Sequence, residues 1–314
     1  MHQTLNQRAQ RVVDRMRADL DGLRVERHEV AGASVFDCGI EAVGGVRAGL
    51  EMARVCLADL ADVALEPGDG SSLGLPRVQV ASDQPVRACM ASQYAGWAIK
   101  TGRYFAMGSG PMRAAYGKEE LFDHIPGRET SPVAVGVLET GKLPNDEVVQ
   151  YLAERLQLPD RQISLLAAST KSLAGTVQVV ARSLEMALHK LHELKFDLSH
   201  VVSGVASAPL PPPATDDLAA IGRTNDAILY GGRATVWVNA DDAVIAEVGP
   251  KVPSNASPEY GALFGELFAK YKDFYKIDPM LFSPAEITFF NCRTGRVHSF
   301  GKLNPDVLRR SFGC

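Results

Sequence analysis

The longest stretch of helical periodicity runs from Thr170 to Leu194, TKSLAGTVQVVARSLEMALHKLHEL. At about 3.6 residues per turn, one side of this stretch is apolar and consists of Leu173, Val177, Val180, Leu184, Leu188 and Leu191. The other side is polar and carries Gln178, Arg182, Glu185, His189 and His192. The pattern predicts one continuous amphipathic helix over residues 170–194, with its apolar side against a core.

Other segments divide between helical periodicity and short β-rich runs. Further helices are expected at residues 5–20, 43–60, 82–100, 145–156, 215–232, 259–270 and 304–312. Strands are expected at 24–30, 33–38, 77–81, 131–138, 162–168, 197–202, 233–239, 286–292 and 296–300. The first two strands and the last two are each separated by a short glycine-containing turn, which is typical of hairpins. Helices mixed with hairpins indicate an α+β fold with mixed α/β layers more than a doubly wound parallel sheet.

A proline-rich segment at residues 203–213, SGVASAPLPPP, is expected to be a linker or the wall of a cleft, because proline cannot donate to a sheet ladder. Loops near residues 67–76 and 203–213 bracket the central motifs. The expected division is therefore a discontinuous domain of residues 1–80 and 203–314, and a second domain of residues 81–202.

Composition and charge exclude some classes of function. The chain has 314 residues, with 33 Lys and Arg against 37 Asp and Glu, a net charge of −4. No basic block suggests nucleic-acid or membrane-surface binding. No apolar run approaches the roughly 18 residues needed to span a bilayer, and the N-terminal segment has no signal-peptide pattern, so a cytoplasmic location is expected. The five cysteines are scattered without a CxxC pair, which argues against a disulfide framework or a zinc site.

Arg182 and Glu185 lie one helical turn apart on the polar side of the predicted helix. From spacing alone, a solvated surface ion pair is the expectation. The alternative is a carboxylate that faces a cleft and acts as a base, held charged and oriented by the arginine. His189 and His192 share the same side, but a metal site needs further ligands.

A strand that begins at Arg103 runs into the glycine-rich turn MGSGPMR. Gly108 and Gly110, on either side of Ser109, allow backbone N–H groups to face an anion, and Arg113 adds a charged fork for a phosphate or carboxylate. The segment matches neither of the common nucleotide-binding glycine motifs, so an ordinary loop is an equal alternative.

Five motifs together carry a resemblance that none carries alone: SDQPVRACMASQYAGW, MGSGPMR, STKSLAGTVQVVARSLE, GVASAPLPPP and AIGRTNDAILYGG. In this order and spacing, from about Gly39 to Tyr275, they resemble the methenyltetrahydromethanopterin cyclohydrolases of methanogenic archaea and methylotrophic bacteria. The resemblance implies addition of water to the N5,N10-methenyl carbon of the pterin and opening to the N5-formyl form. It also implies two domains with a pterin cleft between them, no metal, and a homo-oligomer, often a trimer, with a dimer as the other expectation.

The resemblance also implies roles for particular residues. An Arg and a Glu one helical turn apart serve catalysis in this family, and these positions fall on Arg182 and Glu185. Glu185 is expected to deprotonate the attacking water while Arg182 keeps it ionised and oriented. The pterin's amide and amino groups need matched partners, for which the candidates are Ser82, Asp83, Gln93, Gly108, Ser109, Gly110, Arg113, Asn225 and Asp226.

No permanently bound cofactor is expected, because tetrahydromethanopterin, in its full or dephospho form, is the carrier substrate. A role in formaldehyde oxidation by a methylotrophic bacterium follows from the resemblance and from the modest charge of the chain. The rival hypotheses are a binding protein for a pterin or phosphate-bearing ligand, a cysteine amidohydrolase that uses Cys89, and a cyclohydrolase acting on folate. No His or Asp motif accompanies Cys89, and the motifs are not those of the folate enzymes.

Overall fold

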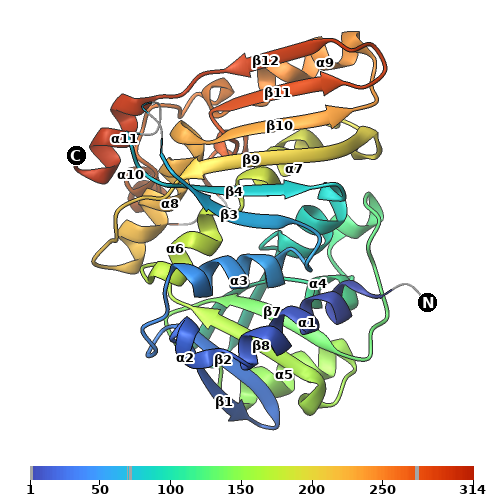
Figure 1. Ribbon diagram of the computed structural model, residues 1–314, viewed down its shortest axis with the longest axis vertical. Coiled ribbons are helices and arrows are strands. Elements are labelled where there is room, and N and C mark those ends of the chain that lie inside the picture. Colours follow the sequence, from blue (N-terminus) through green and yellow to red (C-terminus); the bar gives the residue numbers. More distant parts are fainter. Residues whose placement is uncertain (1–2, 69, 71–72, 273–275) are drawn as a thin grey trace. The chain divides into compact units, whose positions relative to one another are not determined.

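The computed structural model describes residues 3–68, 70, 73–272 and 276–314. The chain forms two compact units, of which unit 1 comprises residues 1–61 and 87–178, and unit 2 comprises residues 62–86 and 179–314. In the described residues, each unit contains one six-stranded sheet with helices packed on it (Figure 1). The α+β class expected from the sequence is confirmed.

The bounds of the two units differ from the expected domains. The N-terminal segment belongs with the middle of the chain because β2 (Ala33–Gly39) pairs in parallel with β8 (Ile163–Ala168). β3 (Asp62–Glu66) and β4 (Arg77–Ser82) share a sheet with the strands of the C-terminal part, as the expected grouping of residues 1–80 with 203–314 implied for them. Strand partners distant in the sequence leave no local pattern. Residues 69, 71 and 72 of the expected loop at 67–76 lie outside the described residues.

Unit 1 is built on a mixed sheet with strand order β1-β2-β8-β7-β6-β5. Its other strands are β1 (Glu26–Val30), β5 (Trp97–Thr101), β6 (Tyr104–Ser109) and β7 (Ala134–Glu139). Its helices are α1 (Leu5–Arg17), α2 (Leu20–Leu23), α3 (Val46–Cys56), α4 (Met112–Tyr116), α5 (Asp146–Leu156) and most of α6 (Leu173–Val180), with 3-10 turns η3 (Glu120–Asp123) and η4 (Asp160–Gln162).

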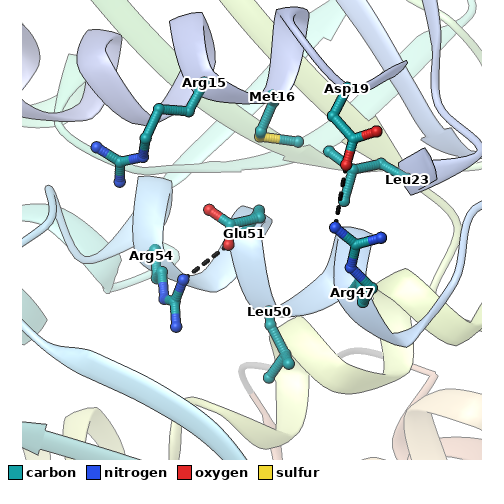
Figure 2. A pocket seen from close by; sticks show the side chains of 8 residues that line it. All are labelled: Arg15, Met16, Asp19, Leu23, Arg47, Leu50, Glu51 and Arg54. Atoms are coloured by element: carbon teal, nitrogen blue, oxygen red, sulfur yellow. Dashed lines mark hydrogen bonds and ion pairs between the residues drawn. The ribbon is translucent and has the colours of Figure 1, made fainter. Parts of the chain in front are cut away.

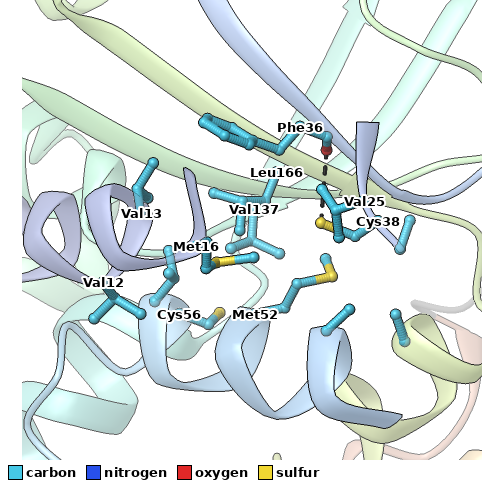
Figure 3. Packing of buried hydrophobic residues seen from close by; sticks show 14 of the residues in the cluster. Val12, Val13, Met16, Val25, Phe36, Cys38, Met52, Cys56, Val137 and Leu166 are labelled. Atoms are coloured by element: carbon cyan, nitrogen blue, oxygen red, sulfur yellow. Dashed lines mark hydrogen bonds between the residues drawn. The ribbon is translucent and has the colours of Figure 1, made fainter. Parts of the chain in front are cut away.

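Both faces of this sheet are covered. On one face, Val12 and Met16 of α1 and Met52 of α3 pack against apolar side chains of β2, β7 and β8 (Figure 3). Ala174 of α6 belongs to the same cluster. On the other face, residues of α5 and α4 pack against the alternate side chains of the same strands. This alternation explains why β7 and β8 are apolar at nearly every position.

Local signals fix the ends of several elements. Thr4 and Gln7 form a capping box at the start of α1, and Asn145 accepts a hydrogen bond from the Val148 N–H at the start of α5. The predicted hairpin of β1 and β2 is confirmed, with Gly32 at φ +89° in its turn.

Unit 2 contains a sheet with strand order β12-β11-β10-β9-β4-β3 (Figure 1). The strands not yet given are β9 (Val201–Pro209), β10 (Arg233–Val238), β11 (Glu286–Asn291) and β12 (Val297–Gly301). Its helices are α7 (Ser183–Glu193), α8 (Asp217–Gly231), α9 (Asp242–Val248), α10 (Phe264–Tyr271) and α11 (Pro305–Phe312), with 3-10 turns η5 (Leu198–His200), η6 (Gly249–Lys251), η7 (Ser254–Ala256) and η9 (Pro279–Leu281). The predicted hairpin of β11 and β12 is confirmed.

The expectation that residues 203–213 are a linker or cleft wall is wrong for most of the segment. Residues 201–209 form β9, an interior strand that pairs antiparallel with β4 and β10. The prolines begin only at Pro209, where the strand ends, so the preceding residues keep their N–H groups for the ladder.

The predicted helix over residues 170–194 is in fact two helices. Residues 169–172 form a turn, α6 spans Leu173–Val180, and a second turn at Ala181 and Arg182 separates it from α7. The Arg182 N–H donates to the Val179 carbonyl, which closes a tight turn. The break follows the β-branched run at 176–180, TVQVV, which has low helix propensity.

The segment expected as a helix over residues 82–100 contains a π-helix, η2 (Val86–Gln93), and then β5. Pro85 directly precedes η2, where its missing N–H is harmless. π-Helical turns are rare in proteins, and those that do occur often lie at functional sites. Within the described part of the chain, none of the helices is long and apolar enough to cross a membrane.

Candidate active site

Arg182 and Glu185 lie at the start of α7, and both are buried, with 7% and 5% of their surfaces exposed. Arg182 is the N-cap residue of α7, and Glu185 lies in the first turn of the helix. The positive end of the helix dipole therefore favours the ionised carboxylate of Glu185. A buried charge needs polar partners, and neither side chain is isolated from the rest of the molecule. The solvated surface ion pair expected from spacing is wrong.

The position of α7 depends on a glycine in the sheet of unit 2. Helix α7 packs on β9 and β10, and a side chain at Gly204 of β9 would meet Cδ1 of Leu184 at 2.8 Å. Leu184 therefore approaches the strand closely where Gly204 has no Cβ. This close approach fixes the first turn of α7, which carries Glu185, against the sheet.

The other end of α7 is anchored by Lys190, which sequence reasoning did not identify. Its ammonium is buried and donates a hydrogen bond to the Met280 carbonyl in η9. Burial lowers the pKa of Lys190 to about 8, against the opposing charges of Asp278 and Glu193. His189 lies on the neighbouring surface of the helix, and its Nε2 is 3.8 Å from Oε1 of Glu193. In the described residues no three His, Cys, Asp or Glu side chains are grouped to hold a metal ion.

Ser82 and Asp83 lie at the end of β4. Ser82 is buried and its hydroxyl accepts a hydrogen bond from the Gln84 N–H, whereas Asp83 is exposed and accepts one from the Ser203 hydroxyl at 2.7 Å. Ser82 is opposite Gly204 in the ladder of β4 and β9. Gly204 thus links these residues to the first turn of α7, through its contact with Leu184.

Asn225 and Asp226 lie inside α8, as the sequence predicted, but their contacts are structural. The Asn225 amide donates to the Ile221 carbonyl one turn earlier. Asp226 accepts hydrogen bonds from the Phe264 N–H of α10 and the Ser311 hydroxyl of α11. Burial raises the pKa of Asp226 to about 6.

The remaining candidates lie together in unit 1, around the end of η2 and the turn after β6. The Gly110 N–H donates to the Ser92 carbonyl at 2.9 Å, and Gly110 has φ +87°, which favours glycine. The Ser109 hydroxyl lies 3.2 Å from the Cys56 sulfur, and Gln93 is fully buried at the last position of η2. Gly108 has no room for a Cβ beside Ile99 and Met112.

Arg113 is fully buried and its guanidinium is occupied by the protein. It forms a two-pronged ion pair with Glu119, with Nε 2.8 Å from Oε1, and it donates to the carbonyls of Met90 and Ser92. The ring of Tyr94 lies 5.0 Å from its Cζ. These contacts hold the last carbonyls of η2, and they favour a structural role over an anion site.

Glu139 is a polar residue that the motifs did not single out. It ends the buried strand β7 and is half-buried, and its Oε1 accepts a hydrogen bond from the Thr170 hydroxyl at 2.5 Å. The available signal was a lone carboxylate directly after an apolar run, VAVGVL, followed by Thr-Gly.

A pocket of about 320 Å³ lies between α1 and α3 and contains none of these candidates (Figure 2). Its lining residues are Arg15, Met16, Asp19, Leu23, Arg47, Leu50, Glu51 and Arg54. Arg47 pairs with Asp19 at 3.0 Å and Arg54 pairs with Glu51 at 2.7 Å. Most of the charged side chains that line this pocket are therefore paired with one another.

Comparison with known proteins connects this geometry to a family. The cyclohydrolase (MCH) family model matches residues 4–312. The methenyltetrahydromethanopterin cyclohydrolase of Rhodopirellula baltica is 46% identical over 298 residues, 93% of this chain and 90% of the relative. That of Methylobacillus flagellatus is 46% identical over 90% of this chain and 87% of the relative, and that of Methanosarcina barkeri is 39% identical over 99% and 98%. The chain therefore belongs to the methenyltetrahydromethanopterin cyclohydrolase family of enzymes.

Proposed function

We propose that this protein hydrolyses N5,N10-methenyltetrahydromethanopterin to N5-formyltetrahydromethanopterin, reversibly, in one-carbon metabolism. The observation that carries the proposal is the buried Arg182 and Glu185 at the start of α7, in a chain whose relatives are named for this reaction. The rival hypothesis of a binding protein without catalysis is not favoured by those names.

The chemistry suits a carboxylate at this position. The methenyl carbon is part of a delocalised cation, so it is electrophilic without a Lewis acid. It needs a water held over its face and a base to take a proton as the C–O bond forms. Glu185 takes that proton, which then passes to N10 as the C–N10 bond breaks. The second proton of the added water leaves the hydroxyl of the adduct to solvent as the C=O bond of the N5-formyl group forms, so the positive charge of the substrate is released as a proton.

Arg182 has a positioning role in this mechanism. Its guanidinium keeps Glu185 ionised and directs the carboxylate toward the water. The negative charge of Glu185 also stabilises the bound cation. No metal takes part in any of these steps.

The binding residues in the proposal are Ser82, Asp83 and Gln93, with Gly108, Ser109 and Gly110 shaping the backbone beside the ring. Ser82 is linked to α7 through Gly204, which supports its inclusion. Arg113, Asn225 and Asp226 are expected to support the structure instead, because their polar groups bond to the protein.

The cellular setting follows from the same proposal. The carrier is tetrahydromethanopterin or its dephospho form, and the reaction takes place in the cytoplasm during formaldehyde oxidation. We expect a homo-oligomer, a trimer or a dimer, and sedimentation velocity on the purified protein would give its mass.

Glu185→Gln tests the mechanism, because it keeps the shape of the side chain and removes the base. We expect kcat to fall by about 10²–10⁴-fold, the range for loss of a general base, with the melting temperature little changed. The assay follows loss of the methenyl chromophore above the spontaneous rate, with methenyltetrahydrofolate as the comparison substrate.

Glu193→Gln, at the other end of α7, is the matched control, and its turnover should equal that of the wild type. If a folded Glu185→Gln variant turns over at nearly the wild-type rate, Glu185 is not the base. If the wild-type protein does not accelerate the reaction at all, the proposed function itself is wrong.

A further inference from the structure

The chain leaves the sheet of unit 1 in opposite directions after two neighbouring parallel strands. β7 and β8 are parallel, with Glu139 opposite Ala168 at their carboxyl ends. From β7 the chain continues to α5, whose Val148 and Leu152 pack on one face. From β8 it continues to α6, whose Ala174 packs on the other face.

We call this place the switch point, consisting of residues 139–142 and 169–172. In open sheets with parallel strands, ligands bind outside the carboxyl ends of the strands where successive connections leave to opposite faces. The connection after β8 also leads, through α6, to Arg182 and Glu185.

Glu139 is the carboxylate at the switch point, and it is oriented by one hydroxyl. The Thr170 side chain, 3% exposed, donates to Oε1. Thr170 is itself fixed, because its carbonyl accepts a hydrogen bond from the Thr176 hydroxyl of α6. Gly175 keeps this turn tight, since a Cβ there would lie 2.0 Å from the Ser169 carbonyl oxygen.

The carboxylate of Glu139 has unused hydrogen-bonding capacity. An ionised carboxylate can accept about four hydrogen bonds, and among the described residues Thr170 is the only side chain that bonds to it. No Lys, Arg or His of those residues pairs with it. A half-buried carboxylate that lacks a cationic partner is suited to a ligand that offers donors.

We propose that Glu139 is a substrate-binding residue that accepts two parallel hydrogen bonds from the pyrimidinone edge of the pterin. This edge presents an amino group and a ring N–H side by side, which matches the two oxygens of a carboxylate. Thr170 sets the orientation of the carboxylate. The inference rests on the proposed function, and it adds a residue and a ring edge to it.

Glu139→Gln is the direct test, because the amide keeps the size of the side chain but turns one acceptor into a donor. We expect KM for the methenyl substrate to rise about 10–100-fold, the range for losing a charged hydrogen-bond partner, with kcat within threefold of the wild-type value. The dissociation constant of tetrahydromethanopterin, measured by calorimetry, should rise by a similar factor. Glu154→Gln, at an exposed position of α5, is the matched control and should leave both constants unchanged.

A substrate analogue separates recognition from a structural effect. Replacement of the 2-amino group by hydrogen should weaken binding to the wild-type protein at least 10-fold more than to Glu139→Gln, because only the wild type has the acceptor pair. A folded Glu139→Gln variant with wild-type KM and dissociation constant overturns the inference. The inference is also overturned if removal of the 2-amino group weakens binding to both proteins by the same factor. In either case an active wild-type enzyme leaves the proposed function intact, whereas an inactive one refutes that function.

Discussion

Asp226 is a carboxylate enclosed by α8, α10 and α11, and burial raises its pKa to about 6 from 3.8. The folded protein therefore holds this proton more tightly than the unfolded chain does. The contribution of Asp226 to stability is greatest below pH 3.8 and is lost as the pH rises through about 6.

Asp226→Asn should remove this dependence. The free energy of unfolding of the wild type relative to Asp226→Asn should fall by roughly 2–3 kcal/mol between about pH 4 and pH 7, at about 1.4 kcal/mol per pKa unit. Urea unfolding of both proteins across this range measures the difference. Asp306→Asn, with an exposed carboxylate, is the control; equal pH profiles for the wild type and Asp226→Asn would contradict the prediction.

At the residue scale, the sequence identified side chains with chemical potential more successfully than it predicted their burial or their bonding partners. Periodicity placed Arg182 and Glu185 on a polar helix side and so predicted exposure, yet both are buried. Arg113 had the pattern of an anion ligand, but its partners Met90, Ser92 and Glu119 lie up to 23 residues away. Burial and partners depend on tertiary contacts, which one sequence does not display.

At the scale of elements, the contact of α3 with α6 depends on Gly49. A Cβ on Gly49 would lie 2.6 Å from Cβ of Val177 and 2.8 Å from the Ala174 carbonyl oxygen. We expect Gly49→Ala to lower the free energy of unfolding by about 1–3 kcal/mol through overpacking, although alanine is the better helix former by about 1 kcal/mol.

Chemical denaturation measures this effect, and Gly265→Ala is the matched control. Gly265 lies in α10, and no atom lies within 4 Å of a Cβ built on it, so this variant should be as stable as the wild type or more so. A Gly49→Ala variant that gains stability like the control would show that α3 and α6 can separate without cost.

Elements with strong local signals were predicted well. The two hairpins follow from apolar alternation and glycine turns, and α5 follows from its Asn145 cap. The π-helical form of η2, the break before α7 and the interior position of β9 were missed. The interior position of β9 depends on its pairing with the distant strands β4 and β10, whereas the break before α7 follows a local β-branched run that periodicity alone does not register.

At the scale of the whole molecule, ligand binding should stabilise the folded chain. A ligand at 100 times its dissociation constant adds about 2.7 kcal/mol to the stability of the protein that binds it. We expect tetrahydromethanopterin to raise the melting temperature by several degrees, and tetrahydrofolate at the same concentration to raise it less. Differential scanning fluorimetry gives both shifts, and equal shifts would argue against selectivity for the methanopterin carrier.

The fold class was predictable at this scale, but the bounds of the units were not. Mixed helices and hairpins gave the α+β class, which is confirmed. The placement of the N-terminal segment depends on the parallel pairing of β2 with β8, more than 120 residues later in the chain. The expected domain bounds were based on loop composition, which indicates solvent exposure but does not indicate which strands pair.

The ion pair of Arg113 and Glu119 has a consequence for how this family can vary. Loss of either partner leaves the other charge without its counterion, at a cost of about 3–5 kcal/mol when the site is buried. A lineage that replaces one residue must therefore replace the other, or pass through a poorly folded intermediate. Across an alignment of relatives, we expect positions 113 and 119 to change together.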